Sequence, residues 1–412
     1  MATLSVTVAG VKLRNPIVVA SSPLTSDIRR IKKAESCGAA AVSIKHAMAE
    51  QPFRGTPRYF VDPQLGIIVC SDRRLDIEES ERIIAEAKEK TNLVVIANMS
   101  GPHSNLDGWG KTAQRLVAAG ADMIELNMNC PNMGLGDCVG DNAIVGATGR
   151  PPLLGASVGQ VPELAGAVTR AVKSAVSVPV MPKLTSEGGS ILAVAKACAE
   201  AGADALNVRA SFVAAPGIDI YDDGRPVVTG LKGKANIAGL TGRWSRLISN
   251  RFIAQVAQTV PTPIMGAGGI SQWEHVVEKI MYGSSCVQIC TALVLNGFEI
   301  IPRMLNKLES YLERQGYDDF SAIRGAALKH IVAAPQLEFV PVVSTVDEEL
   351  CNGCGKCARV GTCSAIEMKE KKAVVTAEEC VGCSVCKWLC PTKAITMRHT
   401  ETRHTQTALN AG

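Results

Sequence analysis

Aromatic residues, an excess of one charge and long apolar runs are all scarce in this sequence. Phe, Trp and Tyr make up 4% of the 412 residues, which argues against a platform on which nucleic-acid bases stack. The formal net charge of +4 gives no electrostatic reason to expect nucleic acid or an anionic membrane as a partner. No stretch approaches the roughly 18 uncharged apolar residues of a membrane span. The N-terminus lacks the basic and apolar regions of a signal peptide, so we expect a cytoplasmic protein.

A nicotinamide-binding fingerprint is also lacking. No Gly-x-Gly-x-x-Gly stretch stands between an expected strand and helix with an acidic residue downstream. We therefore do not expect this chain to bind a nicotinamide cofactor itself.

The first 315 residues contain one repeated pair of patterns. A short apolar, β-branched run is followed by a turn and by an amphipathic stretch of helical periodicity. Continuous apolar strands that alternate with helices are typical of a parallel sheet covered by helices. Eight such units favour a (β/α)8 TIM barrel over a doubly wound open sheet, which is the competing arrangement. The expected strands are 16–20, 40–45, 93–98, 122–127, 178–183, 204–208, 262–266 and 286–290.

Eight of the 15 cysteines lie close together near the C-terminal end, in metal-ligand spacing. The second run, Cys380, Cys383, Cys386 and Cys390 followed by proline, matches the pattern of bacterial two-cluster ferredoxins. In that pattern the fourth cysteine of each run ligates the other [4Fe-4S] cluster, so one cluster uses Cys351, Cys354, Cys357 and Cys390, and the other uses Cys363, Cys380, Cys383 and Cys386. Structural zinc is the alternative, and two zinc sites would rarely need this doubled motif.

These patterns divide the chain into four expected parts. Residues 1–315 form the barrel, and residues 316–343 form a connector. Residues 344–398 form a small α+β domain of the two-cluster ferredoxin type, and 399–412 form a polar, disordered tail. Two connections within the barrel, 128–160 and 209–243, are long, and loops of such length are usually functional.

Polar and ionisable side chains gather where the expected strands end. The C-terminal ends of the strands of a (β/α)8 barrel meet on one face, and the chemistry takes place there. The pattern therefore indicates a single site. Its candidates are Lys45, Asn98, Asn127, Cys130, Lys183, Asn207, Cys290, Thr291 and the glycine-rich stretch 266–269.

A barrel that does chemistry beside iron–sulfur clusters needs a cofactor that converts one-electron steps into a two-electron step. Flavin is the usual cofactor of this kind. The stretches GAGGI (266–270) and CTAL (290–293) end strands seven and eight, where many barrels bind phosphate. Glycines let backbone amides approach phosphate oxygens, so we expect the phosphate of a flavin there.

Four stretches, ELNMNCPN (125–132), MPKLT (181–185), IMGAGGI (264–270) and VQICTAL (287–293), precede the paired cysteine motifs. Together they resemble the dihydroorotate and dihydropyrimidine dehydrogenase family, in the same domain order and over almost the whole chain. The resemblance implies FMN on the barrel top. The matching FMN positions are Ala20, Ser21, Lys45, Asn98, Lys183, Gly268, Gly269, Cys290 and Thr291.

The resemblance also implies roles for single residues. Lys183 would lie near the N1/O2 edge of the flavin, where a cation stabilises the anionic reduced ring. Cys130 would be the general acid that protonates one ring carbon while hydride reaches its neighbour, and its thiolate would be the base in the reverse direction. Asn127, Asn132 and Asn207 match substrate-binding asparagines.

Three positions depart from the family pattern. Asn129 stands where serine is usual, and Val208 stands where a hydroxyl residue is usual. Asn132 matches the dihydroorotate enzymes, whereas the dihydropyrimidine enzymes have histidine there. A missing hydroxyl leaves a ring amide or carbonyl unpaired, and this rejects a substrate strongly.

The expected activity is the interconversion of a ring C=C bond and its dihydro form, with uracil or thymine as the default substrate. Electrons would pass through two [4Fe-4S] clusters to FMN, from a separate FAD/NAD(P)H subunit or a ferredoxin. One alternative is the same chemistry on a different cyclic amide, conjugated ring or enone. Another is an electron-relay subunit of a larger complex. Homodimers are common in the family, and the residues leave the oligomeric state open.

Overall fold

The computed structural model describes residues 2–49, 55–130, 154–210 and 212–400 of the chain. It divides into two compact units, Met1–Ile331 and Val332–Gly412, which are treated separately below. No helix in the described ranges combines the length and the apolar character needed to cross a lipid bilayer.

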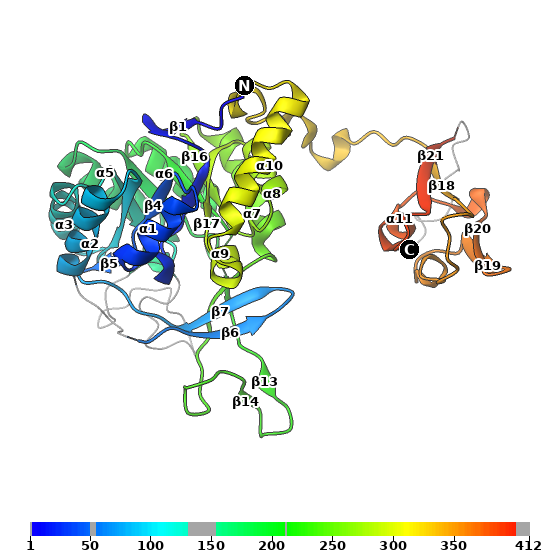
Figure 1. Ribbon diagram of the computed structural model, residues 1–412, viewed down its shortest axis with the longest axis horizontal. Helices are drawn as coiled ribbons and strands as arrows, with labels where there is room; N and C mark the ends of the chain where they lie inside the picture. The colour runs from blue at the N-terminus through cyan, green and yellow to red at the C-terminus, as the bar shows by residue number, and fades with distance from the viewer. Residues whose placement is uncertain (1, 50–54, 131–153, 211, 401–412) are drawn as a thin grey trace. The chain divides into compact units, whose positions relative to one another are not determined.

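The first unit is a closed barrel of eight parallel strands, which confirms the predicted (β/α)8 fold (Figure 1). Each strand pairs with its neighbours in chain order, and the last pairs with the first. The strands are β3 (Ile17–Val19), β4 (Ala41–Ser43), β8 (Val94–Ser100), β9 (Met123–Asn127), β10 (Val180–Lys183), β11 (Leu206–Val208), β16 (Ile264–Ala267) and β17 (Ser284–Ile289).

Helices follow the strands and cover the outside of the barrel (Figure 1). The start of the second of them is fixed by a capping box, in which the Asp76 carboxylate accepts from Glu79 N at 2.8 Å and Glu79 Oε2 accepts from Asp76 N at 3.3 Å. The helices are α1 (Ile28–Ser36), α2 (Ile77–Lys90), α3 (Leu106–Ala118), α4 (Ala156–Gly159), α5 (Pro162–Ala175), α6 (Ile191–Glu200), α7 (Ser245–Thr259), α8 (Trp273–Met281), α9 (Thr291–Asn296) and α10 (Ile300–Gln315).

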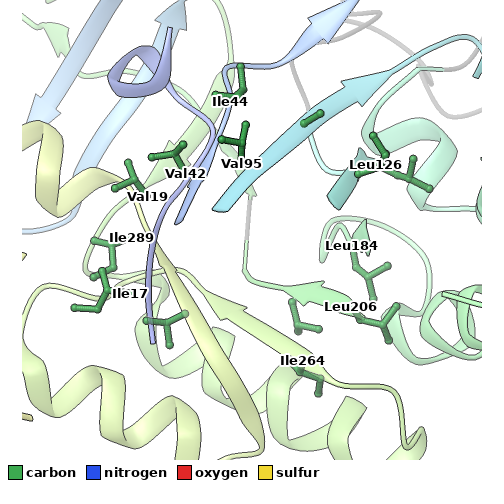
Figure 2. Close-up of a cluster of buried hydrophobic side chains, with 14 of the residues drawn as sticks. Ile17, Val19, Val42, Ile44, Val95, Leu126, Leu184, Leu206, Ile264 and Ile289 are labelled. Atoms are coloured by element: carbon green, nitrogen blue, oxygen red, sulfur yellow. The ribbon is translucent and has the colours of Figure 1, made fainter. Parts of the chain in front are cut away.

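Alternate residues of each barrel strand face outward, because successive side chains of a strand point to opposite faces. These outward residues join the helices in one large apolar core, part of which Figure 2 shows, with Val19, Val42 and Leu126 among the labelled residues. Phe320 and Ile323, which follow α10, belong to the same core. The continuous apolar runs in the sequence thus reflect burial of the strands on both faces.

The inward residues nearest the start of the strands form a second, smaller core. The hairpin β1 (Val6–Val8) and β2 (Val11–Leu13) packs against them through Val8 and Leu13. This inner apolar layer fills the barrel at the N-terminal ends of its strands. Its members are Val18, Ala41, Ile96, Met123, Met181, Ala205, Met265 and Cys286.

A four-stranded antiparallel sheet, which the sequence analysis did not anticipate, is built from two barrel connections. The hairpin β6 (Arg58–Asp62) and β7 (Gly66–Ser71) follows β4, whereas β15 (Ala238–Thr241) and β12 (Phe212–Ala214) follow β11. The two connections join where β7 pairs with β15. Figure 1 shows β6 and β7 on the side of the barrel opposite β1. We call this sheet the roof.

Four smaller strand pairings, two in each unit, complete the fold. Strand β5 (Ala47–Met48) adds to the barrel beside β8, and β13 (Ile218–Asp219) forms a hairpin with β14 (Arg225–Pro226). The second unit consists of β18 (Val342–Val346) paired with β21 (Ile395–His399), β19 (Ile366–Lys369) paired with β20 (Lys372–Val375), and helix α11 (Val385–Leu389). Its small core includes Cys357 and Cys386, as the α+β ferredoxin-like prediction requires.

Candidate active site

One step beyond the inner apolar layer, the inward-facing residues of the barrel become polar. They lie two positions further along each strand and are at most 4% exposed. We call them the polar layer, and its members are Ser43, Asn98, Glu125, Lys183, Asn207 and Gln288.

Glu125 is the centre of the polar layer. Its Oε2 accepts from Ser43 Oγ at 2.7 Å and from the Asn98 amide. Its Oε1 accepts from Asn207 Nδ2 and from Gln288 Nε2, both at 2.7 Å. A buried carboxylate with this many donors is fully satisfied, which is the condition for keeping a charge inside a protein.

Lys183 lies beside Glu125 in the same layer. Its Nζ is 3.4 Å from Glu125 Oε2 and donates to Gln288 Oε1 at 2.9 Å. Burial lowers the pKa of Lys183, and the Glu125 carboxylate partly opposes that shift. Burial alone would raise the pKa of Glu125, but the Lys183 ammonium and the Ser43 and Asn98 donors hold it below its ordinary value. The pair therefore favours an ionised carboxylate beneath a cation.

The turn that carries Cys130 is fixed by side-chain hydrogen bonds to the end of β9. Asn127 Nδ2 donates to Asn98 Oδ1 at 3.0 Å, which ties the turn to the polar layer. Asn127 Oδ1 accepts from Cys130 N at 3.0 Å and from Asn129 N at 3.3 Å. The Cys130 thiol is partly exposed, and its Sγ lies 3.5 Å from Nη2 of Arg74, a residue contributed by the connection after β4.

The Cys130 thiol opens into a cavity of about 900 Å³ between the barrel and the roof, which we call the thiol cavity. The roof contributes Tyr59, Ile67 and Val69 to its wall, so this sheet separates the cavity from solvent on one side. His46, whose ring nitrogen lies 2.7 Å from Ser100 Oγ, also faces it, and burial with three nearby cations lowers the pKa of His46. The other polar lining residues are Ser21, Ser22, Lys45, Asp72, Arg74, Asn127, Asn129, Lys183, Arg209, Thr241 and Cys290.

A second cavity, of about 740 Å³, adjoins the first and shares Lys183, Arg209 and Cys290 with it. We call it the glycine cavity, because Gly268 and Gly269 form part of its wall. Both glycines have positive φ, and a Cβ at Gly268 would collide with Ser249 Oγ. A Cβ at Gly269 would collide with backbone atoms of Arg246, in the first turn of α7. Other lining residues are Ala20, Gly242, Arg243, Ser245, Thr291 and Ala292.

The glycine cavity has the features of a phosphate site. Glycines leave the backbone accessible at close range, so the backbone of this loop can approach a bound phosphate oxygen. Arg243 and Ser245 add a cation and a hydroxyl. The residues present therefore fit the phosphate group of a flavin mononucleotide, with the shared wall at Lys183 leading into the thiol cavity.

The structure brings most of the predicted site residues together around these two cavities. Asn98 and Asn207 lie beneath the cavities in the polar layer, and Asn132 lies outside the described residues. Among the described residues, Asn207 Oδ1 and Asn129 Oδ1 are buried and have no hydrogen-bond partner, and Asn129, which lines the thiol cavity, can offer its acceptor to a bound group. The predicted residues that line a cavity are Ala20, Ser21, Lys45, Asn127, Cys130, Lys183, Gly268, Gly269, Cys290 and Thr291.

The sequence analysis missed several polar residues of the site, and four of them are instructive. Glu125 and Gln288 stand in the middle of apolar strands, and this position is the signal that could have identified them. The sequence analysis singled out Val208 as a departure from the family pattern, but Val208 faces the outer core. The next residue, Arg209, lines both cavities. Arg74 lies in the connection between β4 and α2, which also carries two strands of the roof. No local pattern in the sequence indicates that Arg74 lines the cavity.

Four cysteines of the second unit surround a small cavity of about 310 Å³. They are Cys351, Cys354 and Cys357 of the first run and Cys390 of the second, the set that the ferredoxin pattern predicts for one cluster. Ala394 N donates to Cys390 Sγ at 3.2 Å, as expected for a sulfur held ready as a ligand. Across the ranges that the structure covers, no three His, Cys, Asp or Glu side chains converge as a single-ion site.

Fold and site together define an iron–sulfur oxidoreductase built on a (β/α)8 barrel, and comparisons with known proteins agree. The sequence pattern of the dihydroorotate dehydrogenase family matches residues 151–312, and that of the 4Fe-4S binding domain matches residues 373–396. The chain belongs to the dihydroorotate dehydrogenase family and is an enzyme of the dehydrogenase class. Members of this family bind FMN.

Relatives of two kinds are similar to the chain. The PreA subunit of NAD-dependent dihydropyrimidine dehydrogenase from Escherichia coli K12 is 31% identical over 367 residues, covering 86% of this chain and 84% of that subunit. The catalytic subunit of dihydroorotate dehydrogenase B (NAD(+)) from Methanosarcina mazei is 31% identical over 331 residues, covering 79% and 95%. The corresponding subunit from Thermoplasma volcanium is 31% identical over 333 residues, covering 80% and 100%.

Proposed function

We propose that this chain interconverts a ring C=C bond and its dihydro form, with electrons exchanged through [4Fe-4S] clusters and FMN. The observation that carries the proposal is that Cys130 and Lys183 line one partly open cavity, which adjoins a phosphate-type glycine cavity. A proton donor, a cation and a flavin site in one place are the parts that this reaction class requires.

The residues that would hold FMN come from the strand ends. Gly268, Gly269 and Ser245 would hold its phosphate, and Lys183 would face its ring from below. Bound FMN would supply the conversion between single electrons from the clusters and the two-electron change of the ring. The remaining proposed positions are Ala20, Ser21, Lys45, Asn98, Cys290 and Thr291.

Proton transfer is the task that we assign to Cys130. Its Sγ holds the proton that is delivered to a ring carbon during reduction, and the thiolate takes that proton back during oxidation. The Asn127 side chain holds the Cys130 backbone through a 3.0 Å hydrogen bond, so the thiol keeps a defined place over the cavity. Asn127, Asn132 and Asn207 are the proposed substrate-binding residues, and the roof excludes water from the reacting atoms.

We further propose two clusters in the second unit. Cys351, Cys354, Cys357 and Cys390 would ligate one, and Cys363, Cys380, Cys383 and Cys386 would ligate the other. The cavity bounded by the first set supports this assignment. A FAD/NAD(P)H subunit or a ferredoxin would deliver the electrons, in line with relatives that are themselves subunits named as NAD-dependent.

The experiment that tests the proposal is Cys130→Ser, measured as reoxidation of the reduced protein by uracil, thymine and orotate. Serine keeps the shape but is a much weaker acid, so we expect ring reduction to slow by about 10²- to 10⁴-fold. Flavin and iron contents should match those of the unchanged protein. Cys37→Ser, at a buried cysteine at the end of α1, is the matched control and should leave the rate unaltered. An undiminished rate in Cys130→Ser would remove the assigned role.

A second candidate keeps the chemistry and changes the ring. Asn129 lines the thiol cavity where the family usually has serine, and its Oδ1 has no partner within the protein. An amide acceptor in place of a hydroxyl favours a substrate with an additional N–H or O–H donor. A cyclic amide or enone that reoxidises the protein while uracil and thymine do not would establish this candidate.

A further inference from the structure

A further cavity of the first unit, of about 680 Å³, lies at the N-terminal ends of the barrel strands. It is bounded by β1, the start of β17, the last turn of α8 and the short helical turn Phe320–Ala322. Figure 1 shows β1 on the side of the barrel away from the roof hairpin β6–β7. The cavity shares no lining residue with the thiol cavity or the glycine cavity, and it lies at the strand ends where barrel enzymes do not carry out their chemistry.

Hydroxyl groups make up most of the polar wall of this cavity, which we call the hydroxyl cavity. They belong to Ser5, Thr7, Ser284, Ser285 and Ser321. Two charged side chains, Asp319 and Arg324, complete the polar wall. Hydroxyls that both donate and accept, together with one cation and one carboxylate, suit a small polar ligand rather than an apolar one.

Ser285 lies in a bulge at the start of β17. Ser284 pairs with Ile264 of β16, and the next residue of β16, Met265, pairs with Cys286, so Ser285 has no partner on that strand. Such a bulge changes the direction of a side chain, and bulges are common beside functional sites. The irregular start of β17 thus lies in the wall of the hydroxyl cavity.

Arg324 and Ser285 together present hydrogen-bond donors to the cavity. Arg324 Nη1 donates to Ser285 Oγ at 3.3 Å, and within the described part of the chain this is the one hydrogen bond that the guanidinium group makes. Its other N–H groups therefore remain available to a ligand. Because Ser285 Oγ is the acceptor in this bond, its own O–H can also donate to a ligand.

Asp319 supplies the acceptor of the cavity. Its Oδ1 accepts from Ser321 N at 2.6 Å, and the hydrogen bonds from Ser321 hold the pKa of Asp319 below its ordinary value. Asp319 and Arg324 line the same cavity, yet neither forms an ion pair with any residue that the structure describes. The carboxylate and the guanidinium can thus bind two different groups of one ligand.

We propose that the hydroxyl cavity binds a small phosphorylated polyol, such as a sugar phosphate. The phosphate accepts from Arg324 and Ser285, since the planar fork of arginine matches the geometry of phosphate oxygens. Hydroxyl groups of the same ligand donate to Asp319 and exchange hydrogen bonds with the serine and threonine hydroxyls. A volume of about 680 Å³ is larger than a free phosphate ion needs and lies within the usual range of small-molecule sites.

Calorimetric titration of the FMN-loaded holoprotein tests the proposal, because FMN then occupies the glycine cavity. The probes are ribose 5-phosphate and glycerol 3-phosphate, with inorganic phosphate and ribose each representing one half of the ligand. We expect at least one phosphorylated polyol to bind about 10-fold more tightly than inorganic phosphate or ribose, since each of these lacks part of the contacts. If both polyol phosphates fail to bind, or bind no more tightly than inorganic phosphate, the proposal is wrong. Binding to the flavin-free protein alone would assign the ligand to the glycine cavity and also refute it.

Arg324→Gln and Ser285→Ala test the residues. Arg324→Gln should weaken binding of the phosphorylated polyol by about 10- to 100-fold, and Ser285→Ala by about 2- to 10-fold. Arg324→Lys should recover part of the loss, since it keeps the charge without the planar fork. Arg303→Gln, at an exposed position of α10, is the matched control and should bind the ligand as before.

Thermal unfolding separates a lost binding site from a damaged fold. Arg324 is exposed and makes a single side-chain hydrogen bond among the described residues, so Arg324→Gln should unfold near the temperature of the unchanged protein when no ligand is present. A ligand that binds only the folded state raises this temperature, and Arg324→Gln should lose that rise. If Arg324→Gln binds the ligand as tightly as the unchanged protein does, the ligand lies elsewhere and the proposal is wrong.

Discussion

Glu125 shows how one buried side chain supports a site that it does not line. It accepts hydrogen bonds from four strands, and it is the charge partner of Lys183. Replacing it by glutamine would leave a buried ammonium without a counterion and would place an NH2 group where two of the four donors now meet an acceptor oxygen. Such losses are among the largest that a single substitution causes.

We expect Glu125→Gln to lower the free energy of unfolding by about 3–5 kcal/mol, because it breaks a buried pair by removing one partner. Urea denaturation followed by circular dichroism measures this change. Glu299→Gln is the control, since Glu299 pairs with Lys33 on the surface and should show no measurable loss. Equal effects of the two substitutions would mean that the Glu125 network adds no stability.

The lowered pKa of Glu125 also predicts that the stability of the protein depends on pH. The folded-state pKa of Glu125 is lowered, so its contribution is present above its ordinary value of 4.5 and is lost as the pH falls through the folded-state pKa. The midpoint of urea unfolding in the unchanged protein should therefore fall more steeply below pH 4.5 than that of Glu125→Gln. Parallel curves for the two proteins would contradict this assignment.

Lys279, on α8, also predicts that stability rises with pH, here in the alkaline range. Its side chain is fully buried, and Nζ donates to Asn250 Oδ1 at 3.1 Å. Burial lowers the pKa of Lys279 to about 7. Because the unfolded chain then binds more protons than the folded one above pH 7, stability should rise from pH 7 to 10, by at most about 1.4 kcal/mol per pH unit. Lys279→Met should show a flatter thermal midpoint over this range, and an unchanged slope would contradict the prediction.

Individual strands and loops set the geometry of the cavities, and the loop after β16 is the most constrained of them. Gly268 and Gly269 both adopt positive φ and have no room for a Cβ. A side chain at Gly269 would displace the first turn of α7, where Ser245 lines the glycine cavity.

We expect Gly269→Ala to yield folded protein that has lost most of its flavin, measured by absorbance after gel filtration. Gly316→Ala is the matched control: Gly316 ends α10 with a similar φ of +70°, and its Cβ position is open. The control should cost about 1 kcal/mol of stability and retain flavin. Equal flavin loss in both variants would show that φ alone, and not the space beside α7, is responsible.

The barrel strands could be predicted from the sequence because each is an apolar run with its own turn signal. The roof could not, since β7 pairs with β15 from a distant part of the chain and neither run is long or strongly periodic. The site residues also fall into a group that could be predicted from the sequence and a group that could not. Lys183 and Cys130 were identified from strand ends, whereas Arg74 lines the cavity only because the connection between β4 and α2 folds over it.

For the whole molecule, the proposed function assigns proton transfer to the first unit and electron supply to the second. The cavity that Cys351, Cys354, Cys357 and Cys390 line joins cysteines from both runs of the second unit. Ligands drawn from both ends of the unit also tie its strands together, so cluster assembly and folding should depend on each other.

Paired substitutions test this crossed arrangement. Cys351→Ser and Cys390→Ser should each remove the same cluster, so the double variant should contain as much iron as either single variant. Cys351→Ser combined with Cys380→Ser should remove both clusters. Iron and acid-labile sulfide analysis after anaerobic purification, with electron paramagnetic resonance of the reduced protein, measures the outcome. If the double variant of Cys351 and Cys390 lost twice as much iron as either single variant, the two cysteines would not share a cluster.

Because inward-facing residues are stacked along each strand, substitutions at different levels of the barrel affect different properties of the protein. Along β9, for example, Met123 fills the barrel, Glu125 anchors the hydrogen-bond network and Asn127 lines the thiol cavity. The residues that support the fold and the residue that faces the cavity thus occupy different positions of one short segment. Replacement of the outermost residue of such a strand can change the wall of the cavity while the interior below stays intact.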